Sequence, residues 1–520
     1  MEDHNSGGRC AHCNCGKAEK KTAKDESVWI DTASLPEFPP LKGDQTFDVV
    51  VIGGGITGLT AALELVTAGK KVAVIEASKV GQGVTGYTTA HITSIIDTRF
   101  QDLLKRWGKT KAQLVATSSG AAVEKISQNV TTHAIACDFA HVPGYLYSER
   151  QEDRSLLEQE AVAAQQLGLA ASFTEDVPLP FKTFGGVKFE NQAQFHPLQY
   201  LHGLVAAITQ AGGLIFEMTR VTDVQDGEPC IITTEHGKLQ AAAVIMATHT
   251  PITKMLGMQS KVAAYHSYVV AVRPAPSEGV PGLFWDTDQP YHYWRTYTTS
   301  AGPLVIVGGE DHKTGKKSAD PKECYERIKQ YTCKRLAGQP MYQWSAQVFE
   351  PVDGLPYIGL APRFEHVYLA TGYAGNGITF GTVAGMMLPA LILHGEHAWQ
   401  ALYKPTRISF SWGALKRQIE QAFDIMKNLL FERFRRAAKG DAVDVVPGEG
   451  KILSMDGAKI AIYKDAHGNV TKLSPICPHA GCIVQWNNAE KTWDCPCHGS
   501  RFTAEGAVIN GPAIKALEVK

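Results

Sequence analysis

The chain has almost no net charge, and this limits the partners that its surface can attract. Lysine and arginine together number 51, against 52 for aspartate and glutamate. A surface with so little excess charge has no long-range field to attract a polyanion. We therefore expect no nucleic-acid partner.

The chain also lacks long apolar runs. No uninterrupted apolar stretch of about 18 residues is present to cross a bilayer. Residues 1–6 contain neither the basic nor the apolar segment of a secretory signal. The 11 cysteines do not form the even framework of a small secreted protein. These absences favour a cytoplasmic location.

What the sequence does contain is enough chain for two or three domains, because 520 residues exceed one ordinary hydrophobic core. Residues 47–52 are typical of a buried parallel strand, and a helical segment, 59–68, follows a glycine-rich turn. In that turn Gly53 permits a tight bend and Gly55 lets a pyrophosphate approach the backbone. Gly58 lets the helix pack closely on the strand.

A second predicted strand, 71–76, ends in an acid about 20 residues after the turn. Glu76 stands where such an acid bonds the ribose hydroxyls of an adenine dinucleotide. Strand, helix, strand and acid in this order predict a dinucleotide site. The alternative is a strand–helix–strand unit without a ligand, and the pattern does not distinguish NAD from FAD.

Segments spread along the following 300 residues decide between these cofactors. They are the small-residue loop 81–91, the Phe195-His-Pro197 segment, Val221, the strand 243–248, Asp353-Gly354-Leu-Pro356 and residues 367–379. In this order they resemble the D-amino-acid oxidase and glycine oxidase superfamily of FAD-dependent oxidoreductases. The resemblance covers residues 47–395 and implies FAD as the cofactor.

The resemblance also implies which residues bind FAD. They are Gly53, Gly55, Gly58, Glu76, Thr85, Thr88, Thr89, Val221, Gly354, Gly375, Gly377 and Thr379. The helix N-terminus in the last segment is expected to face the flavin and stabilise its reduced anionic form. The family commonly has lysine at the position of His91, and some members attach FAD through a histidine in this region. His91 is therefore either a covalent attachment point or a hydrogen-bonded residue of the loop.

A second domain is expected to cover the reactive face of the flavin and to determine substrate specificity. Tyr291, Tyr293 and Arg295 lie within it at alternating positions. In amino-acid oxidases a tyrosine and an arginine commonly hold the substrate carboxylate. The alternative for this segment is an edge strand with a surface arginine.

Two Cys-His couples stand near the C-terminal end of the chain. They are Cys477-Pro-His479 and, with 15 residues between the two couples, Cys495-Pro-Cys497-His498. Each couple puts two ligands on one tight loop, so two facing loops could clamp a cluster. The spacing resembles a Rieske [2Fe-2S] site with the ligands Cys477, His479, Cys495 and His498. A zinc site is the alternative, but it explains neither the additional cysteines nor the loop residues.

The resemblance to the Rieske proteins of quinol-oxidising complexes extends beyond the ligands. It implies a disulfide between Cys482 and Cys497, and it aligns Gly511-Pro512 with the proline loop that covers the cluster. One position departs from the family. Phe502 stands where a tyrosine hydroxyl often bonds a ligand sulfur, so a lower reduction potential is expected.

Between the two cofactor regions, one segment has the periodicity of an amphipathic helix. Its apolar residues, spaced by three or four, are Leu415, Ile419, Phe423, Met426, Leu430 and Phe434. Residues 412–439 carry seven basic and three acidic side chains. The helix is either a linker packed on the flavin domain or a peripheral contact with an anionic membrane near a quinone pool.

These features together predict an α/β FAD-binding Rossmann-like domain with an interleaved α+β substrate domain, followed by a small all-β Rieske domain. The expected units are a lead-in (1–46), an oxidoreductase (47–410), the linker helix (411–440) and the Rieske domain (441–520). Within the oxidoreductase, the FAD domain comprises 47–140, 190–255 and 345–400, and the substrate domain comprises 141–189 and 256–344. In the lead-in, Cys10, Cys13 and Cys15 are either metal ligands or part of a disordered tail.

The combination resembles bacterial FAD-dependent oxidoreductases of the D-amino-acid oxidase superfamily with a fused Rieske domain. It implies oxidation of an amine or amino acid, with electrons passing singly through the cluster to a quinone, cytochrome or other redox protein. An NAD(P)H-linked reductase or monooxygenase component is an alternative, although no second strand–GxGxxG–helix unit is present. A non-enzymatic redox carrier or sensor is a further alternative.

Overall fold

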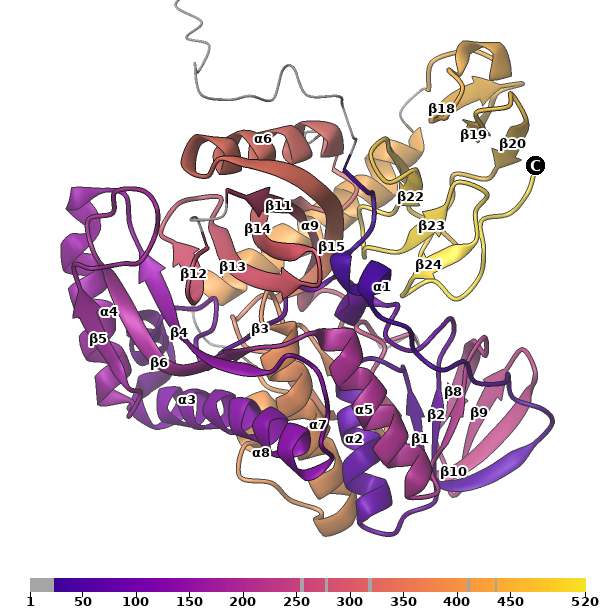
Figure 1. Ribbon diagram of the computed structural model, residues 1–520. Coiled ribbons are helices and arrows are strands. Elements are labelled where there is room, and N and C mark those ends of the chain that lie inside the picture. The colour runs from indigo at the N-terminus through magenta and orange to yellow at the C-terminus, as the bar shows by residue number, and fades with distance from the viewer. Residues whose placement is uncertain (1–22, 253–256, 276–278, 317–319, 409–411, 435–436) are drawn as a thin grey trace, which may run out of the picture.

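The computed structural model describes residues 23–252, 257–275, 279–316, 320–408, 412–434 and 437–520. Two large sheets occupy the first 400 residues, and two small antiparallel sheets form the C-terminal part (Figure 1). The segment with Cys10, Cys13 and Cys15 lies outside the described residues.

The first sheet has a parallel centre. Its order is β16 (Tyr357–Leu360), β17 (Val367–Thr371), β10 (Gly237–Met246), β1 (Gln45–Ile52), β2 (Val72–Ile75) and β7 (Leu214–Phe216), and β9 (Cys230–Thr234) joins β8 (Val221–Gln225) to β10. Strand β1 is buried on both faces, as its run of valines predicts. Val49 and Val51 contribute to the larger core cluster, whereas Val50 and Ile52 contribute to a separate one.

Helices cover one face of this sheet. They are α2 (Ile56–Thr67), α5 (Pro197–Gln210) and α7 (Gly377–His394), and α2 packs against both others (Figure 1). Helix α7 is long and apolar enough to cross a membrane, but 67% of its residues are buried inside the protein. It is therefore explained as a core helix.

The second sheet interleaves with the first along the chain. Its order is β15 (Gly338–Pro351), β11 (Val262–Pro274), β14 (Gly302–Lys313), β13 (His292–Thr299), β12 (Leu283–Asp286), β4 (Ala140–Tyr147), β6 (Gly186–Gln194) and β3 (His91–Ile92), with β5 (Ala171–Thr174) beside β6. Helix α6 (Pro321–Arg335) packs on β11 and β14, and α4 (Arg154–Gln166) packs on β5 and β6. The long helix α3 (Phe100–Thr132) contacts α4, α5 and α7.

Short elements complete the first 400 residues. They are α1 (Val28–Thr32), η1 (Val84–Tyr87), η2 (Gln151–Asp153) and α8 (Gln400–Tyr403). Buried Arg407 follows α8 and donates to both carboxylate oxygens of Asp353, at 2.8 and 2.7 Å. It also donates to the carbonyl of Pro356 at 2.6 Å, so it holds the loop that precedes β16.

The C-terminal part follows α9 (Trp412–Phe434) and η3 (Ala442–Asp444). One sheet contains β18 (Glu449–Met455), β19 (Ala458–Lys464) and β20 (Val470–Leu473), and the other contains β21 (Gln485–Asn487), β22 (Thr492–Asp494), β23 (Arg501–Thr503) and β24 (Val508–Asn510). The whole architecture confirms the predicted fold class. An α/β unit and an α+β unit interleave along the chain, and a small all-β unit follows both.

Helix α9 corrects one sequence-based interpretation. The helix forms, but Leu415, Ile419, Phe423 and Met426 are 44%, 60%, 62% and 53% exposed, so these four do not pack on the flavin domain. The opposite face, which is mixed, makes the contacts instead: Lys313 pairs with Asp424 at 2.7 Å, and Ile425 and Leu429 pack against the core of the C-terminal part. The side chains of Leu430 and Phe434 lie outside the described part.

Candidate functional site

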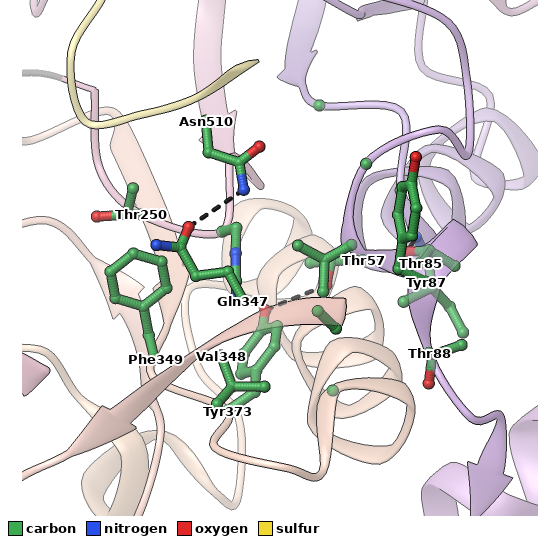
Figure 2. Close-up of a pocket in the computed structure, with 18 of the residues that line it drawn as sticks. Thr57, Thr85, Tyr87, Thr88, Thr250, Gln347, Val348, Phe349, Tyr373 and Asn510 are labelled. Carbon is green, nitrogen blue, oxygen red and sulfur yellow. Dashed lines mark hydrogen bonds between the residues drawn. The ribbon is translucent and has the colours of Figure 1, made fainter. Parts of the chain in front are cut away.

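One cavity is lined by both large sheets and by the C-terminal part. The ends of β1 and β10 contribute Gly53 and Ala247, the second sheet contributes Tyr293 and Gln347, and the loop after β24 contributes Gly511. Figure 2 shows Asn510 of the C-terminal part facing Gln347 across this cavity wall. The cavity therefore joins regions that are far apart in sequence.

The glycine turn after β1 forms one wall. Gly53 has φ +113°, and a Cβ there would lie 2.5 Å from the carbonyl oxygen of Ala247. Glu76 accepts from the backbone N–H groups of Gly54 at 2.8 Å and Ser78 at 2.9 Å. Burial raises the pKa of this carboxyl. Ile56 N donates to Thr85 Oγ1 at 3.2 Å, so the 85–89 loop lies against the N-terminus of α2.

Most of the proposed FAD residues line this cavity. They are Gly53, Gly55, Glu76, Thr85, Thr88, Thr89, Val221, Gly375 and Gly377. The other three are supporting residues beside it. Gly58 packs where a Cβ would collide with the Gly53 carbonyl. Thr98 Oγ1 donates to the Gly354 carbonyl at 3.4 Å, and Thr379 donates to the Thr93 carbonyl at 2.7 Å.

His91 lines the cavity with both ring nitrogens hydrogen-bonded. Nδ1 lies 3.1 Å from Thr89 Oγ1, and Nε2 donates to the Trp294 carbonyl at 3.2 Å. Burial, helped by the charge of Arg295, lowers the pKa of His91 to about 3, so the ring is neutral. These contacts favour the hydrogen-bonded interpretation of His91.

The three residues proposed for substrate binding separate in the structure. Tyr291 and Tyr293 line the cavity with ring centroids 5.7 Å apart, and Tyr293 Oη lies 2.7 Å from Ser267 Oγ. Arg295 is not among the lining residues and is 1% exposed.

Arg295 is thus neither a carboxylate clamp nor a surface residue. Its Nη1 donates to the carbonyls of Thr89, Ala90 and Phe195, at 3.1, 2.7 and 3.2 Å. Two of these three carbonyls belong to the 88–90 loop, whereas Nε of the buried guanidinium has no hydrogen-bond partner among the described residues. Arg295 holds that loop in place.

Two acids in the wall were not found from the sequence. Asp97, in the loop before α3, accepts from Gly375 N at 2.8 Å, and Asp311 lies near the end of β14. Asp97 is exposed and Asp311 half-buried, and desolvation by the surrounding walls raises the pKa of Asp97 to about 6 and that of Asp311 to about 7. No local pattern marks these acids, because segments distant in sequence bring them together.

The two Cys-His loops face each other as predicted. Cys477 and Cys495 are buried and not disulfide-bonded, and the rings of His479 and His498 have centroids 4.9 Å apart. Nδ1 of His498 is buried without a hydrogen-bond partner in the described part of the chain. Two thiols, two imidazoles and an unsatisfied ring nitrogen fit the ligand set of a Rieske cluster.

The expected disulfide is present between Cys482 and Cys497, with Cα atoms 6.4 Å apart, and it joins the two loops. Phe502 is fully buried in the adjoining core. The lower potential expected from this phenylalanine stays a prediction.

Gln347 connects the cluster region with the cavity. It lines the cavity, its Nε2 donates to the Gly499 carbonyl at 2.8 Å, and its Oε1 accepts from Asn510 at 3.1 Å. Gly499 directly follows His498. A Cβ at Gly499 would lie 2.8 Å from Gln347 Nε2, so this approach is close.

Comparison with known families finds two matches that together span most of the chain. The FAD dependent oxidoreductase family, DAO, matches residues 48–391, and the Rieske [2Fe-2S] domain matches residues 437–519. The second match answers the zinc alternative, because a Rieske domain binds a [2Fe-2S] cluster.

Among curated proteins, the chain is 33% identical over 497 residues to the Rieske 2Fe-2S iron-sulfur protein YhfW of Bacillus subtilis (strain 168), covering 95% of this chain and 97% of that one. It is 26% identical over 400 residues to the gamma-glutamylputrescine oxidoreductase of Escherichia coli (strain K12), covering 73% and 91%. The structure of glycine oxidase from Geobacillus kaustophilus has a TM-score of 0.59 at 19% identity, covering 70% of this chain and 99% of that one.

Proposed function

Because the chain belongs to the FAD dependent oxidoreductase (DAO) family and ends in a Rieske [2Fe-2S] domain, we propose that it oxidises an amine or amino acid and passes the electrons one at a time to an external acceptor. FAD takes up two electrons together and gives them up singly, whereas the cluster carries one. The enzyme is thus a dehydrogenase acting on CH–NH donors. The name of the gamma-glutamylputrescine relative supports this donor class.

The protein's own residues have three tasks in this scheme. The glycine turn with Gly53 and Glu76 holds the dinucleotide, and the loop fixed by Arg295 encloses it. Tyr291 and Tyr293 border the space for the substrate beside the second sheet.

One observation carries the electron-transfer part of the proposal. Gln347 lines the cavity and is hydrogen-bonded to the carbonyl of Gly499, the residue after the cluster ligand His498. This contact supports direct transfer from the cavity to the cluster within one chain. The Rieske domain is then the exit for electrons.

A stopped-flow experiment without oxygen tests this order. The holoenzyme is mixed with a substrate that bleaches the flavin, and the cluster is followed by freeze-quench EPR. We expect the EPR signal of the reduced cluster to appear after, or together with, loss of flavin absorbance. A fully bleached flavin beside a cluster that stays oxidised would refute the relay.

Helix α9 suggests where the protein meets its electron acceptor. Four exposed apolar side chains form one stripe along it, and residues 412–439 carry seven basic against three acidic residues. An apolar stripe with a basic surround suits the surface of an anionic membrane. We therefore propose that α9 lies on such a membrane and that a membrane quinone is the acceptor.

A further inference from the structure

The part of the cavity beside the second sheet is acidic. Asp97 and Asp311 both line it, and burial together with those two acids raises the pKa of nearby Glu350 to about 7. Oδ1 of Asp311 is buried and has no hydrogen-bond partner in the described structure. A buried carboxylate oxygen without a donor is costly, and such sites often await a ligand.

No lysine or arginine among the described lining residues lies beside these acids, and nearby His292, whose charge reaches Asp311, is already paired with Asp286 at 2.9 Å and Glu310 at 3.5 Å. Among the described lining residues Arg220 is the only lysine or arginine, and it lies near Glu76, whose pKa its charge lowers. His91 and His249 also line the cavity, but burial lowers their pKa values to about 3 and about 4. A substrate carboxylate beside Asp311 would thus be buried against like charge without a cation.

Aromatic rings adjoin the acids. The ring of His91 lies 5.4 Å from that of Trp285 and 5.8 Å from that of Tyr293, between centroids. Tyr291 stands beside Asp97, because a Cβ at Gly375 would lie 2.9 Å from Tyr291 Oη and 3.1 Å from Asp97 Oδ2. The faces of tyrosine and tryptophan rings attract cations.

From this arrangement we infer that the cavity binds its substrate as an organic cation, a protonated amine without an α-carboxylate, held between Asp97 and Asp311 and the adjoining aromatic rings. The inference rests on the proposed function and narrows its substrate class. Carboxylates pair with the ammonium group, and the aromatic walls contact the carbon chain. An α-amino acid is disfavoured because its carboxylate has no partner there.

Matched pairs of compounds test whether the substrate is an amine or an amino acid. n-Butylamine is compared with L- and D-norvaline, and 1,4-diaminobutane with L- and D-ornithine, since each pair differs only by a carboxylate. Bleaching of the holoenzyme flavin is measured anaerobically. We expect the amines to bleach it at concentrations at least about tenfold lower than the matching amino acids. Bleaching by the amino acids alone would overturn the inference and leave the proposed oxidation standing.

If no probe bleaches the flavin, the proposed oxidation fails for these donors, and the cation site is judged by binding alone. Isothermal titration with 1,4-diaminobutane then decides. Binding that Asp311→Asn weakens supports the site, and absence of binding overturns it.

Variants separate a binding role from a structural one. Asp311→Asn is expected to weaken amine binding about tenfold or more while raising the melting temperature of the ligand-free enzyme at pH 8, because a desolvated charge, one of whose oxygens has no donor, is removed. Asp456→Asn, at an exposed turn of the C-terminal part, is the matched control and should change neither. A lower melting temperature with unchanged binding would mean that Asp311 is only structural.

Discussion

Gln347 is a residue at which the two cofactor regions meet. Replacing it with leucine keeps the volume but removes the hydrogen bonds to Gly499 and Asn510, each worth about 1 kcal/mol. We expect flavin reduction by substrate to be unchanged and flavin-to-cluster transfer to slow several-fold, as measured by anaerobic stopped flow. Gln339→Leu, at an exposed position of the same strand, is the control. Equal transfer rates in both variants would contradict a role for Gln347.

The acids of the cavity predict that the stability of the ligand-free enzyme and its affinity for a cationic ligand depend on pH. Burial raises the pKa of Asp311 to about 7, above its unfolded value of about 4. Ionisation in this window therefore favours the unfolded state, and the ligand-free enzyme should lose stability as the pH rises from 4 to 7. A cationic ligand needs the ionised acids, so its affinity should rise over the upper part of the same window.

The titratable and charged groups around Asp311 shift its pKa in both directions. Besides desolvation, the charges of Asp97 and Glu310 raise the pKa of Asp311, whereas a hydrogen bond from Ser267 and the charge of His292 lower it. His91 stays neutral above about pH 3. Titration of flavin absorbance with 1,4-diaminobutane between pH 5 and 8 measures the affinity. An affinity that falls with rising pH would contradict the acidic site.

Residues differ in how far the sequence could reveal them. The cluster ligands could be predicted because two short loops carry all four of them. Asp97, Asp311 and Gln347 could not, because three separate segments bring them to one wall. Alternation along the strand places Arg295 on the same side as Tyr291 and Tyr293. It does not show where along the strand the cavity ends and the loop that covers it begins.

At the scale of elements, helix α9 gives a direct test. Leu415, Ile419 and Phe423 are replaced together by serine, which should weaken co-sedimentation with anionic vesicles at least about tenfold, because about 1 kcal/mol or more of apolar burial is lost for each. Neutral vesicles should bind the unaltered protein less than anionic ones. No binding of the unaltered protein to anionic vesicles, or loss of a dimer in the variant, would refute the membrane contact.

The loop before β16 depends on one buried ion pair. Arg407→Leu leaves the carboxylate of Asp353 buried without its partner, and we expect a cost of about 3–5 kcal/mol. Thermal unfolding of the holoenzyme measures the loss as a lower melting temperature. Adding Asp353→Asn should recover part of it, since the unpaired charge is then removed. A single variant that melts like the unaltered protein would contradict this role.

Elements were predicted well where local chemistry decides them. The strand, turn and helix at residues 47–68 form as predicted, because glycine spacing and valine runs act locally. Helix α9 was predicted as a helix, but the sequence left open whether its apolar face packs on the flavin domain or faces outward. Periodicity shows that a helix has two faces, and only the tertiary structure shows which face makes the contacts, here the one with Asp424, Ile425 and Leu429.

At the scale of the whole molecule, the order of the units followed from the motifs, but their contacts did not. Nothing in the sequence near Asn510 indicates that it lies beside Gln347, 163 residues earlier. Such docking depends on the shape of two completed surfaces. It is the part of the architecture that sequence patterns do not encode locally.

The contribution of residues 509–511 and 514 to the cavity wall has a consequence for protein engineering. A foreign iron-sulfur module grafted after residue 440 would supply a cluster, but it would leave a gap where these residues stand. Solvent and dioxygen would then reach the flavin, and such a chimera should leak electrons into hydrogen peroxide. The native module forms part of the cavity wall besides holding the cluster ligands, and an exchanged module must reproduce both properties.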